Sequence, residues 1–123
     1  MKKFLILLIL LMSFTGSIAQ DGHALFSSCQ NVKYLQEQLI NTKTSAFEAG
    51  YCLGMIYGVY ATLTKVDNQN KICLPVLGLS NQKKVEIVSS HLKANQEYLK
   101  KEDVLLIMDA FQTTYPCREN KIN

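Results

Sequence analysis

The pattern of hydrophobic and polar residues predicts helices along most of this chain. The region 47–64 is mostly apolar and carries no charge except Glu48, and 104–115 carries apolar residues at the three- and four-residue spacing of a helix face. No segment alternates hydrophobic and polar residues over the length of a strand. The sequence therefore predicts an all-α protein, a small bundle of about four helices.

The first two expected helices differ in how clearly they are marked. Residues 24–29 form a short first helix, and the polar stretch 30–44 either extends it or forms an ordered loop. The second helix, 47–64, is preceded by Ser45, and Glu48 follows three residues later. In this capping-box pattern each side chain satisfies a backbone N–H of the first turn.

The last two helices have clear ends. Ser80 is expected to cap a third helix over 81–95. A fourth helix covers 101–114, begins with acidic residues that suit the helix dipole, and ends before Pro116. The expected buried faces are Val85, Val88 and Leu92 on the third helix, and Val104, Ile107, Met108, Phe111 and Tyr115 on the fourth.

Three glycines, Gly50, Gly54 and Gly58, recur every four residues along the second helix and form one ridge. Each costs a helix about 1 kcal/mol relative to alanine. Their shared face suggests that another backbone passes close by, within the bundle or in a homodimer. A membrane helix is disfavoured because the segment is short and holds three tyrosines. We therefore expect a buried central helix with Gly50, Gly54 and Gly58 as its packing ridge.

The N-terminus has the layout of a secretory signal. Lys2 and Lys3 precede nine consecutive apolar residues, 4–12, and small side chains stand one and three places before a cut after Ala19. Nine residues are too few to span a bilayer, which needs about 20. We expect residues 1–19 to be removed and residues 20–123 to form a single exported domain.

Four cysteines, Cys29, Cys52, Cys73 and Cys117, lie in the expected mature chain. An even number in an exported protein favours disulfides. If short connections make the helices alternate in direction, Cys29 and Cys52 lie at one end of the bundle and Cys73 and Cys117 at the other. This topology favours Cys29–Cys52 and Cys73–Cys117, so the bundle is expected to be stapled by two disulfides.

The charge balance and the available side chains argue against several classes of function. Lys2 and Lys3 account for two of the 13 basic residues, which leaves 11 against 10 acidic residues in the mature chain. That balance calls for neither a nucleic acid nor a membrane surface as partner. The cysteines lack the close pairs of a zinc site, and only His23 and His91 are available to activate a thiol. We expect no metal, no cofactor and no enzyme activity.

Several motifs occur in an order that resembles a known family. They are the run Ala49-Gly50-Tyr51-Cys52-Leu53-Gly54-Met55-Ile56-Tyr57-Gly58-Val59, then Cys73-Leu74-Pro75, a helix start with Gln82, Ala110-Phe111 and Tyr115-Pro116-Cys117, with Cys29 upstream. Together they resemble the type VI secretion immunity proteins that neutralise cell-wall amidase effectors, the Tai-like family. The resemblance covers nearly all of the mature chain.

The resemblance implies a helical, disulfide-containing periplasmic protein, often dimeric, that binds a secreted amidase and obstructs its active-site cleft. Exposed connectors on a stapled scaffold commonly supply such an interface. We therefore take the polar stretch 30–44 and the joint 95–101 as candidate binding regions. The partner-binding residues expected in the joint are Asn95, Gln96, Glu97, Tyr98, Lys100 and Lys101.

Two alternatives remain at this point. One is a small periplasmic acid-stress chaperone of the helical, disulfide-bonded kind, which ten acidic residues and two histidines allow but do not distinguish. The other is a family member with a different protein partner.

Overall fold

The computed structural model describes residues 20–36, 43–66 and 71–117. It contains α2 (Gly22–Gln36), α3 (Lys43–Leu63), α4 (Asn81–Ala94), the short 3-10 helix η2 (Gln96–Tyr98) and α5 (Asp103–Thr114). Within these ranges the chain forms helices and no named strand, which confirms the all-α prediction. The expected signal peptide, 1–19, lies outside the described residues.

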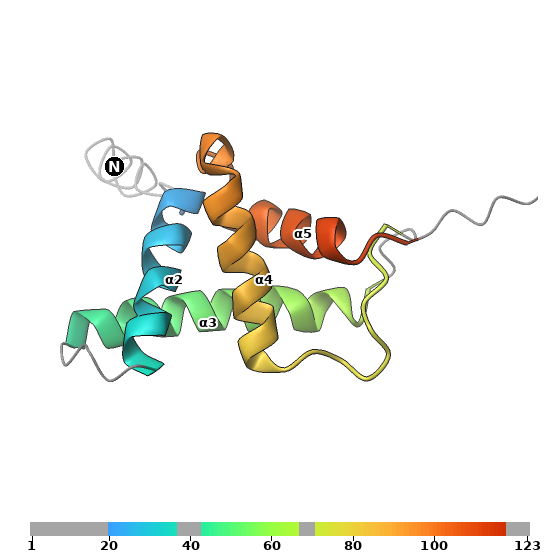
Figure 1. The fold of residues 1–123 in the computed structure, drawn as a ribbon, viewed down its shortest axis with the longest axis horizontal. Coiled ribbons are helices and arrows are strands. Elements are labelled where there is room, and N and C mark those ends of the chain that lie inside the picture. The colour runs from blue at the N-terminus through green and yellow to red at the C-terminus, as the bar shows by residue number, and fades with distance from the viewer. Residues whose placement is uncertain (1–19, 37–42, 67–70, 118–123) are drawn as a thin grey trace, which may run out of the picture.

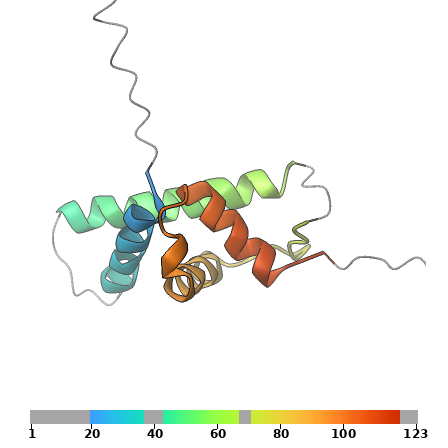
Figure 2. The ribbon, with the colours of Figure 1, turned by 90° about the horizontal axis from the view of Figure 1, so that it is seen from above.

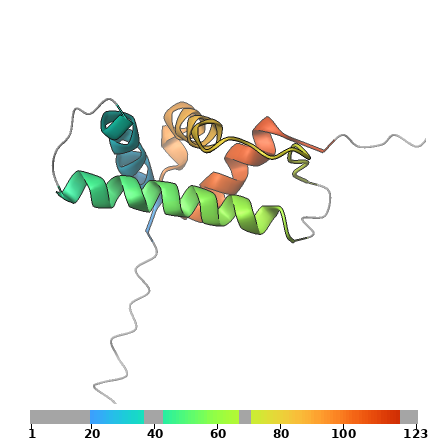
Figure 3. The same ribbon diagram turned by 90° about the horizontal axis from the view of Figure 1, so that it is seen from below.

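The longest helix, α3, forms one side of the molecule, and α2, α4 and α5 all pack against it from the same side (Figure 1). Views from above and below show the other long side of α3 bare of neighbouring helices (Figures 2 and 3). The expectation of a buried central helix is therefore wrong. Over 46–63, the part of α3 whose burial the structure describes, only every third or fourth residue is buried, and these residues are Ala49, Cys52, Ile56, Tyr60 and Leu63.

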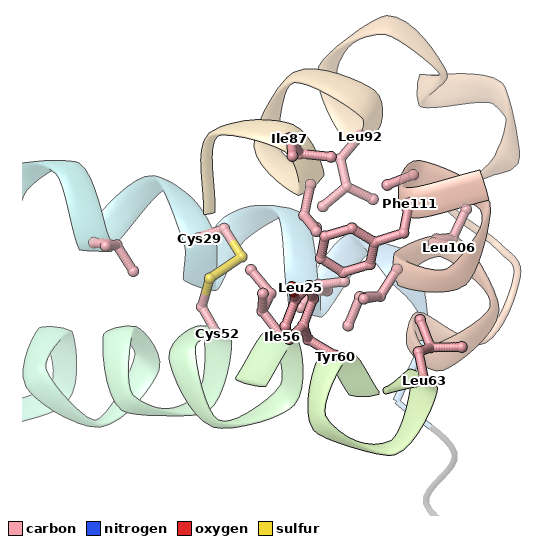
Figure 4. Close-up of a cluster of buried hydrophobic side chains, with 14 of the residues drawn as sticks. Leu25, Cys29, Cys52, Ile56, Tyr60, Leu63, Ile87, Leu92, Leu106 and Phe111 are labelled. Atoms are coloured by element: carbon pink, nitrogen blue, oxygen red, sulfur yellow. A yellow bond between two sulfur atoms is a disulfide. The ribbon is translucent and has the colours of Figure 1, made fainter. Parts of the chain in front are cut away.

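The core lies between α3 and the three helices on its covered side (Figure 4). Phe111 of α5 is fully buried and packs edge-to-face on Tyr60 of α3, with ring centroids 5.3 Å apart. Aromatic pairs of this geometry contribute about 0.5–1.5 kcal/mol beyond the area they bury. The other large, fully buried side chains are Leu25, Ile56, Val88, Leu92, Leu106 and Ile107.

Both predicted disulfides are present. Cys29–Cys52 joins α2 to α3 with a Cα–Cα distance of 5.0 Å, and Cys73–Cys117 joins the segment before α4 to the segment after α5 at 4.9 Å. The predicted pairing is confirmed. The reason given for Cys29–Cys52, that both cysteines lie at one end of the bundle, is wrong. Cys29 and Cys52 lie near the middle of their helices, where α2 crosses α3, and not at one end of a bundle.

The helix boundaries follow local sequence closely where capping decides them. Ser80 caps α4 as expected, and its Oγ accepts a hydrogen bond from Lys83 N–H at 3.2 Å. The capping box at Ser45 is wrong, because α3 already begins at Lys43. Glu48 accepts instead from the Asn31 side-chain amide and so ties α3 to α2.

The ambiguous stretch 30–44 is largely settled. Residues 30–36 extend the first helix, and 43–44 already belong to α3. Residues 37–42 lie outside the described part. None of the described helices is both long enough and apolar enough to cross a membrane.

The buried face of α5 differs from the expected stripe by part of a turn. Ile107 and Phe111 are buried as predicted, but Val104 is 39% exposed and Met108 is half-buried. The remaining buried residues of α5 are Asp103, Leu106 and Ala110. Because α5 itself carries apolar residues on more than one side, periodicity alone did not decide which side meets the core.

Candidate protein-binding surfaces

A tight turn between α3 and α4 exposes two aliphatic side chains completely. In the apolar turn, Pro75–Gly78, the Gly78 N–H donates to the Pro75 carbonyl at 2.9 Å. Gly78 has a φ of 76°, a value that glycine adopts without strain. Val76 and Leu77 occupy the tip with relative exposures of 103% and 101%. Single exposed apolar residues are ordinary, but two adjacent ones at full exposure form a candidate contact point for another surface.

Contacts on both sides hold the apolar turn in place. Leu74 and Leu79 flank it and pack against the core. Cys73 N–H donates to the Tyr115 carbonyl at 2.9 Å, and the disulfide to Cys117 ties the same residue to the segment after α5. A fixed turn loses less conformational entropy on binding than a loose one.

The structure places the expected partner-binding residues in the joint between α4 and α5. Gln96, Glu97, Tyr98, Lys100 and Lys101 are exposed and Asn95 is half-buried. Lys101 Nζ lies 4.7 Å from the centre of the Tyr98 ring and 3.6 Å from the Asp109 carboxylate. Leu99, 4% exposed, anchors the joint in the core. The joint is thus an ordered, accessible surface with an aromatic–cation pair.

Gly22 lets the first helix approach this joint. Its N–H donates to the Lys101 carbonyl at 3.0 Å. A Cβ built on Gly22 would lie 2.9 Å from the Leu99 carbonyl oxygen and 2.1 Å from Leu106 Cδ1. This is the close backbone approach that the sequence suggested for other glycines. Its only sequence signal is a glycine at the start of a helix.

The candidate binding regions do not converge on one surface. The apolar turn precedes α4 and the joint follows it, so the 14 residues of α4 separate them by about 21 Å along its axis. The start of α2 contacts the joint, whereas residues 30–36 lie toward the other end of that helix. Sequence reasoning missed Val76 and Leu77, because the sequence does not mark which apolar residues of a connector remain exposed.

The glycine ridge lies on the bare side of α3. Within the described part of the chain, no atom beyond the helix's own neighbouring backbone comes within 4 Å of a Cβ built on Gly50, Gly54 or Gly58. The expectation that another segment of the bundle packs on this ridge is therefore wrong.

Gly54 and Gly58 help to line a shallow cleft of about 380 Å³ between α3 and α5. We call this surface the open face. Its other lining residues are Met55, Val59, Thr62, Leu63, Val66, Val104 and Met108. Most of these side chains are apolar, and Val66 is 51% exposed. The open face is therefore an apolar surface with room for a closely approaching partner.

A larger and more polar cleft of about 850 Å³ lies between α2 and α4. Phe26, Val32 and Val85 form its apolar part, and Glu86 and Lys93 belong to its charged rim. Glu86 is already paired with Lys83 at 3.2 Å. In the described residues no three metal-ligating side chains cluster, in this cleft or elsewhere.

Two ionisable groups have environments that change their pKa values. Burial raises the pKa of Tyr51 above its ordinary 10.0, and the hydroxyl's hydrogen bond to the buried Asp103 carboxylate raises it further. Burial also lowers the pKa of His91 below 6.5, against an opposing effect from Asp109. Tyr51 and Asp103 join α3 to α5 inside the fold, so we assign this pair a structural role.

These surfaces define a class of protein: a small helical scaffold, stapled by two disulfides, that presents apolar and aromatic side chains to another macromolecule. The model of the Rap1a immunity proteins matches residues 21–117. The chain therefore belongs to the Rap1a immunity protein family, and it is an immunity protein directed against a secreted effector. Comparisons with curated proteins and with solved structures find no match.

Proposed function

We propose that this chain is a periplasmic immunity protein that binds a type VI secreted peptidoglycan amidase and obstructs its active-site cleft with the apolar turn. The complete exposure of Val76 and Leu77 on a turn anchored at both ends carries this proposal. Family membership supports the immunity role. The amidase target rests on the resemblance of the motifs at 49–59 and 115–117 to the Tai-like proteins. Export follows from a signal peptide cleaved after Ala19.

The apolar turn has enough apolar surface to matter for affinity. Burying a valine or leucine side chain fully is worth about 1.5–3 kcal/mol, so Val76 and Leu77 together contribute roughly 3–6 kcal/mol. A nanomolar complex requires about 12 kcal/mol. The tip therefore supplies a substantial part of such an affinity. The balance of 11 basic and 10 acidic residues in the chain expected after removal of residues 1–19 makes electrostatic steering a minor contribution.

The immunity role is tested by deleting the gene and challenging the cells with a sister strain that secretes its effectors. We expect the deletion strain to lose survival and the intact gene to restore it. An effector-deficient attacker is the control. Unchanged survival of the deletion strain would contradict the immunity role and favour another partner for the scaffold.

The role of the apolar turn is tested by complementing the deletion with Val76→Glu/Leu77→Glu. These side chains are fully exposed, so the substitutions leave the core intact and are expected to abolish protection. Phe47→Glu is the matched control, because Phe47 is 78% exposed and lies on α3 away from the turn. Full protection by the double variant would refute the turn as the inserting element.

We further propose that the open face forms a homodimer. Its glycines allow a second backbone to approach closely, and Val66 and Val104 leave apolar area uncovered in the single chain. Light scattering after gel filtration is expected to give twice the monomer mass. Val104→Glu should yield the monomer and Phe47→Glu should leave the dimer intact. A wild-type monomer at high concentration would overturn this proposal.

The family match favours the immunity role over the acid-stress chaperone. An apolar-dye titration from neutral to acid pH separates the two, because a chaperone of that kind exposes apolar surface on acidification.

A further inference from the structure

The two disulfides stand in different environments. Cys29 and Cys52 are 4% and 0% exposed and belong to the core between α2 and α3. Cys73 is exposed and Cys117 is half-buried, and both lie outside the helices. Thiol–disulfide exchange requires a thiolate to reach a disulfide sulfur, so access decides which bridge reacts. An external thiol therefore meets Cys73–Cys117 first.

Opening Cys73–Cys117 leaves other contacts between the two segments that it joins. Cys73 N–H donates to the Tyr115 carbonyl at 2.9 Å, and Cys117 N–H donates to the Lys71 carbonyl at 3.4 Å. Ile72, 6% exposed, remains packed in the core and pairs with Pro116 in an isolated bridge. The core helices keep their own disulfide. The consequence of opening is thus local to the segment that leads into the apolar turn.

We propose that Cys73–Cys117 is a thiol-exchange site, which a dithiol reductant opens without unfolding the protein and thereby loosens the apolar turn. Its partner class is a small dithiol or a dithiol oxidoreductase. The significance of the turn rests on the proposed function, whereas the exchange itself does not.

The exchange proceeds in two balanced steps. The reductant's thiolate attacks Sγ of Cys73, which is the more exposed of the two residues, and forms a mixed disulfide. Cys117 leaves as a thiolate that takes up a proton. The reductant's second thiolate then attacks the reductant's first sulfur, which is bonded to Cys73 in the mixed disulfide. This closes the reductant's disulfide and releases Cys73, which takes up a proton. Two electrons pass from the dithiol to the bridge.

The exchange site is tested on the oxidised full-length protein with dithiothreitol in the absence of denaturant. Samples are quenched with an alkylating agent at intervals and mapped by peptide mass spectrometry. We expect Cys73 and Cys117 to be labelled at least about ten times faster than Cys29 and Cys52, with the far-UV circular dichroism unchanged at that stage. Simultaneous labelling of all four cysteines, or helix loss with the first bridge, would overturn the proposal.

Loosening of the turn is tested by amide hydrogen exchange in Cys73→Ser/Cys117→Ser. The amides of Gly78 and Cys73 donate the hydrogen bonds that hold the turn and its base, so their exchange is expected to accelerate. Amides in the middle of α3 serve as the internal control. If the variant does not fold, the same amides are followed in wild-type protein after selective reduction. Unchanged exchange at Gly78 would refute the loosening.

Neither measurement uses an effector, so both succeed or fail independently of the immunity role. The deletion strain complemented with Cys73→Ser/Cys117→Ser connects them, and we expect reduced survival under challenge. Full protection by this variant would show that the Cys73–Cys117 bridge does not control binding of the effector by the apolar turn.

Discussion

Alanine substitutions at two glycines should change stability in opposite directions. Gly50 is an exposed position inside α3, and a Cβ built there meets no described atom within 4 Å. Gly50→Ala therefore removes the conformational entropy cost of glycine without a clash, and we expect a gain of about 1 kcal/mol. Gly50 lies outside the cleft of the open face, so dimer formation does not affect this comparison.

At Gly22 the same methyl group has no room. The Leu106 side chain, 2.1 Å away, is itself 1% exposed and held in the packed core, and the Leu99 carbonyl at 2.9 Å belongs to the backbone. Forcing atoms into a packed core costs about 1–3 kcal/mol. Gly22 is also the first residue of α2, where helix propensity offsets little of this cost. We expect Gly22→Ala to lower the free energy of unfolding by this amount.

Urea denaturation followed by circular dichroism measures both effects on the oxidised protein. In thermal scans, 1 kcal/mol corresponds to a Tm change of about 4–8 °C for a domain of roughly this size. The double variant tests additivity, because the two sites share no partner. A loss of stability in Gly50→Ala would show that the bare side of α3 is packed after all. A neutral Gly22→Ala would refute the close approach of α2 to the joint.

Three further substitutions test the core and its ionisable groups. Phe111→Ala removes a fully buried ring and its contact with Tyr60, and we expect a loss of about 3–5 kcal/mol in urea denaturation; a loss below about 1 kcal/mol would contradict the packing. The raised pKa of Tyr51 means that the folded state holds its proton where the unfolded chain releases it, so this stability is complete below pH 10.0 and is lost as pH rises further. Tyr51→Phe should flatten the fall of stability above that pH, and an unchanged slope would refute the assignment. The lowered pKa of His91 has the opposite effect on the pH dependence of stability. Its contribution to folding stability is present above pH 6.5 and is lost as pH falls through the pKa of the folded state. His91→Gln should therefore reduce the acid sensitivity of Tm, and equal sensitivity in the variant and the wild type would argue against it.

Sequence reasoning succeeded where local chemistry decides structure. Helical periodicity predicted the helices. The Ser80 cap of α4 was predictable because an N-cap serine bonds only to a backbone N–H in the first turn of the same helix. The disulfide pairing was predicted correctly, although the helix arrangement assumed for Cys29–Cys52 is not the observed one. The crossing of α2 and α3 differs from the expected bundle, yet Cys29 still meets Cys52.

The same reasoning failed where a helix is apolar on more than one side. Almost every position from Phe47 to Leu63 is apolar or glycine, so the sequence does not mark which side of α3 is covered. The three glycines therefore looked like a buried ridge, although they line the bare side. Val104 of α5 was misplaced for the same reason, because it is exposed on the open face, whereas Met108 lines the open face and also packs against the core.

The sequence by itself determined the helical class, an even number of cysteines that favours disulfides, and the resemblance to an immunity family, because these depend on residue types and their spacing along the chain. Only the tertiary structure decided which apolar side chains remain outside. Ile72 and Val76 belong to one short apolar run, yet Ile72 is 6% exposed and Val76 is 103% exposed. The difference arises because Leu74, Leu79 and the Cys73–Cys117 bridge fix where the chain leaves the core and returns to it. Burial of this kind is a property of contacts between distant segments, which residue spacing does not record.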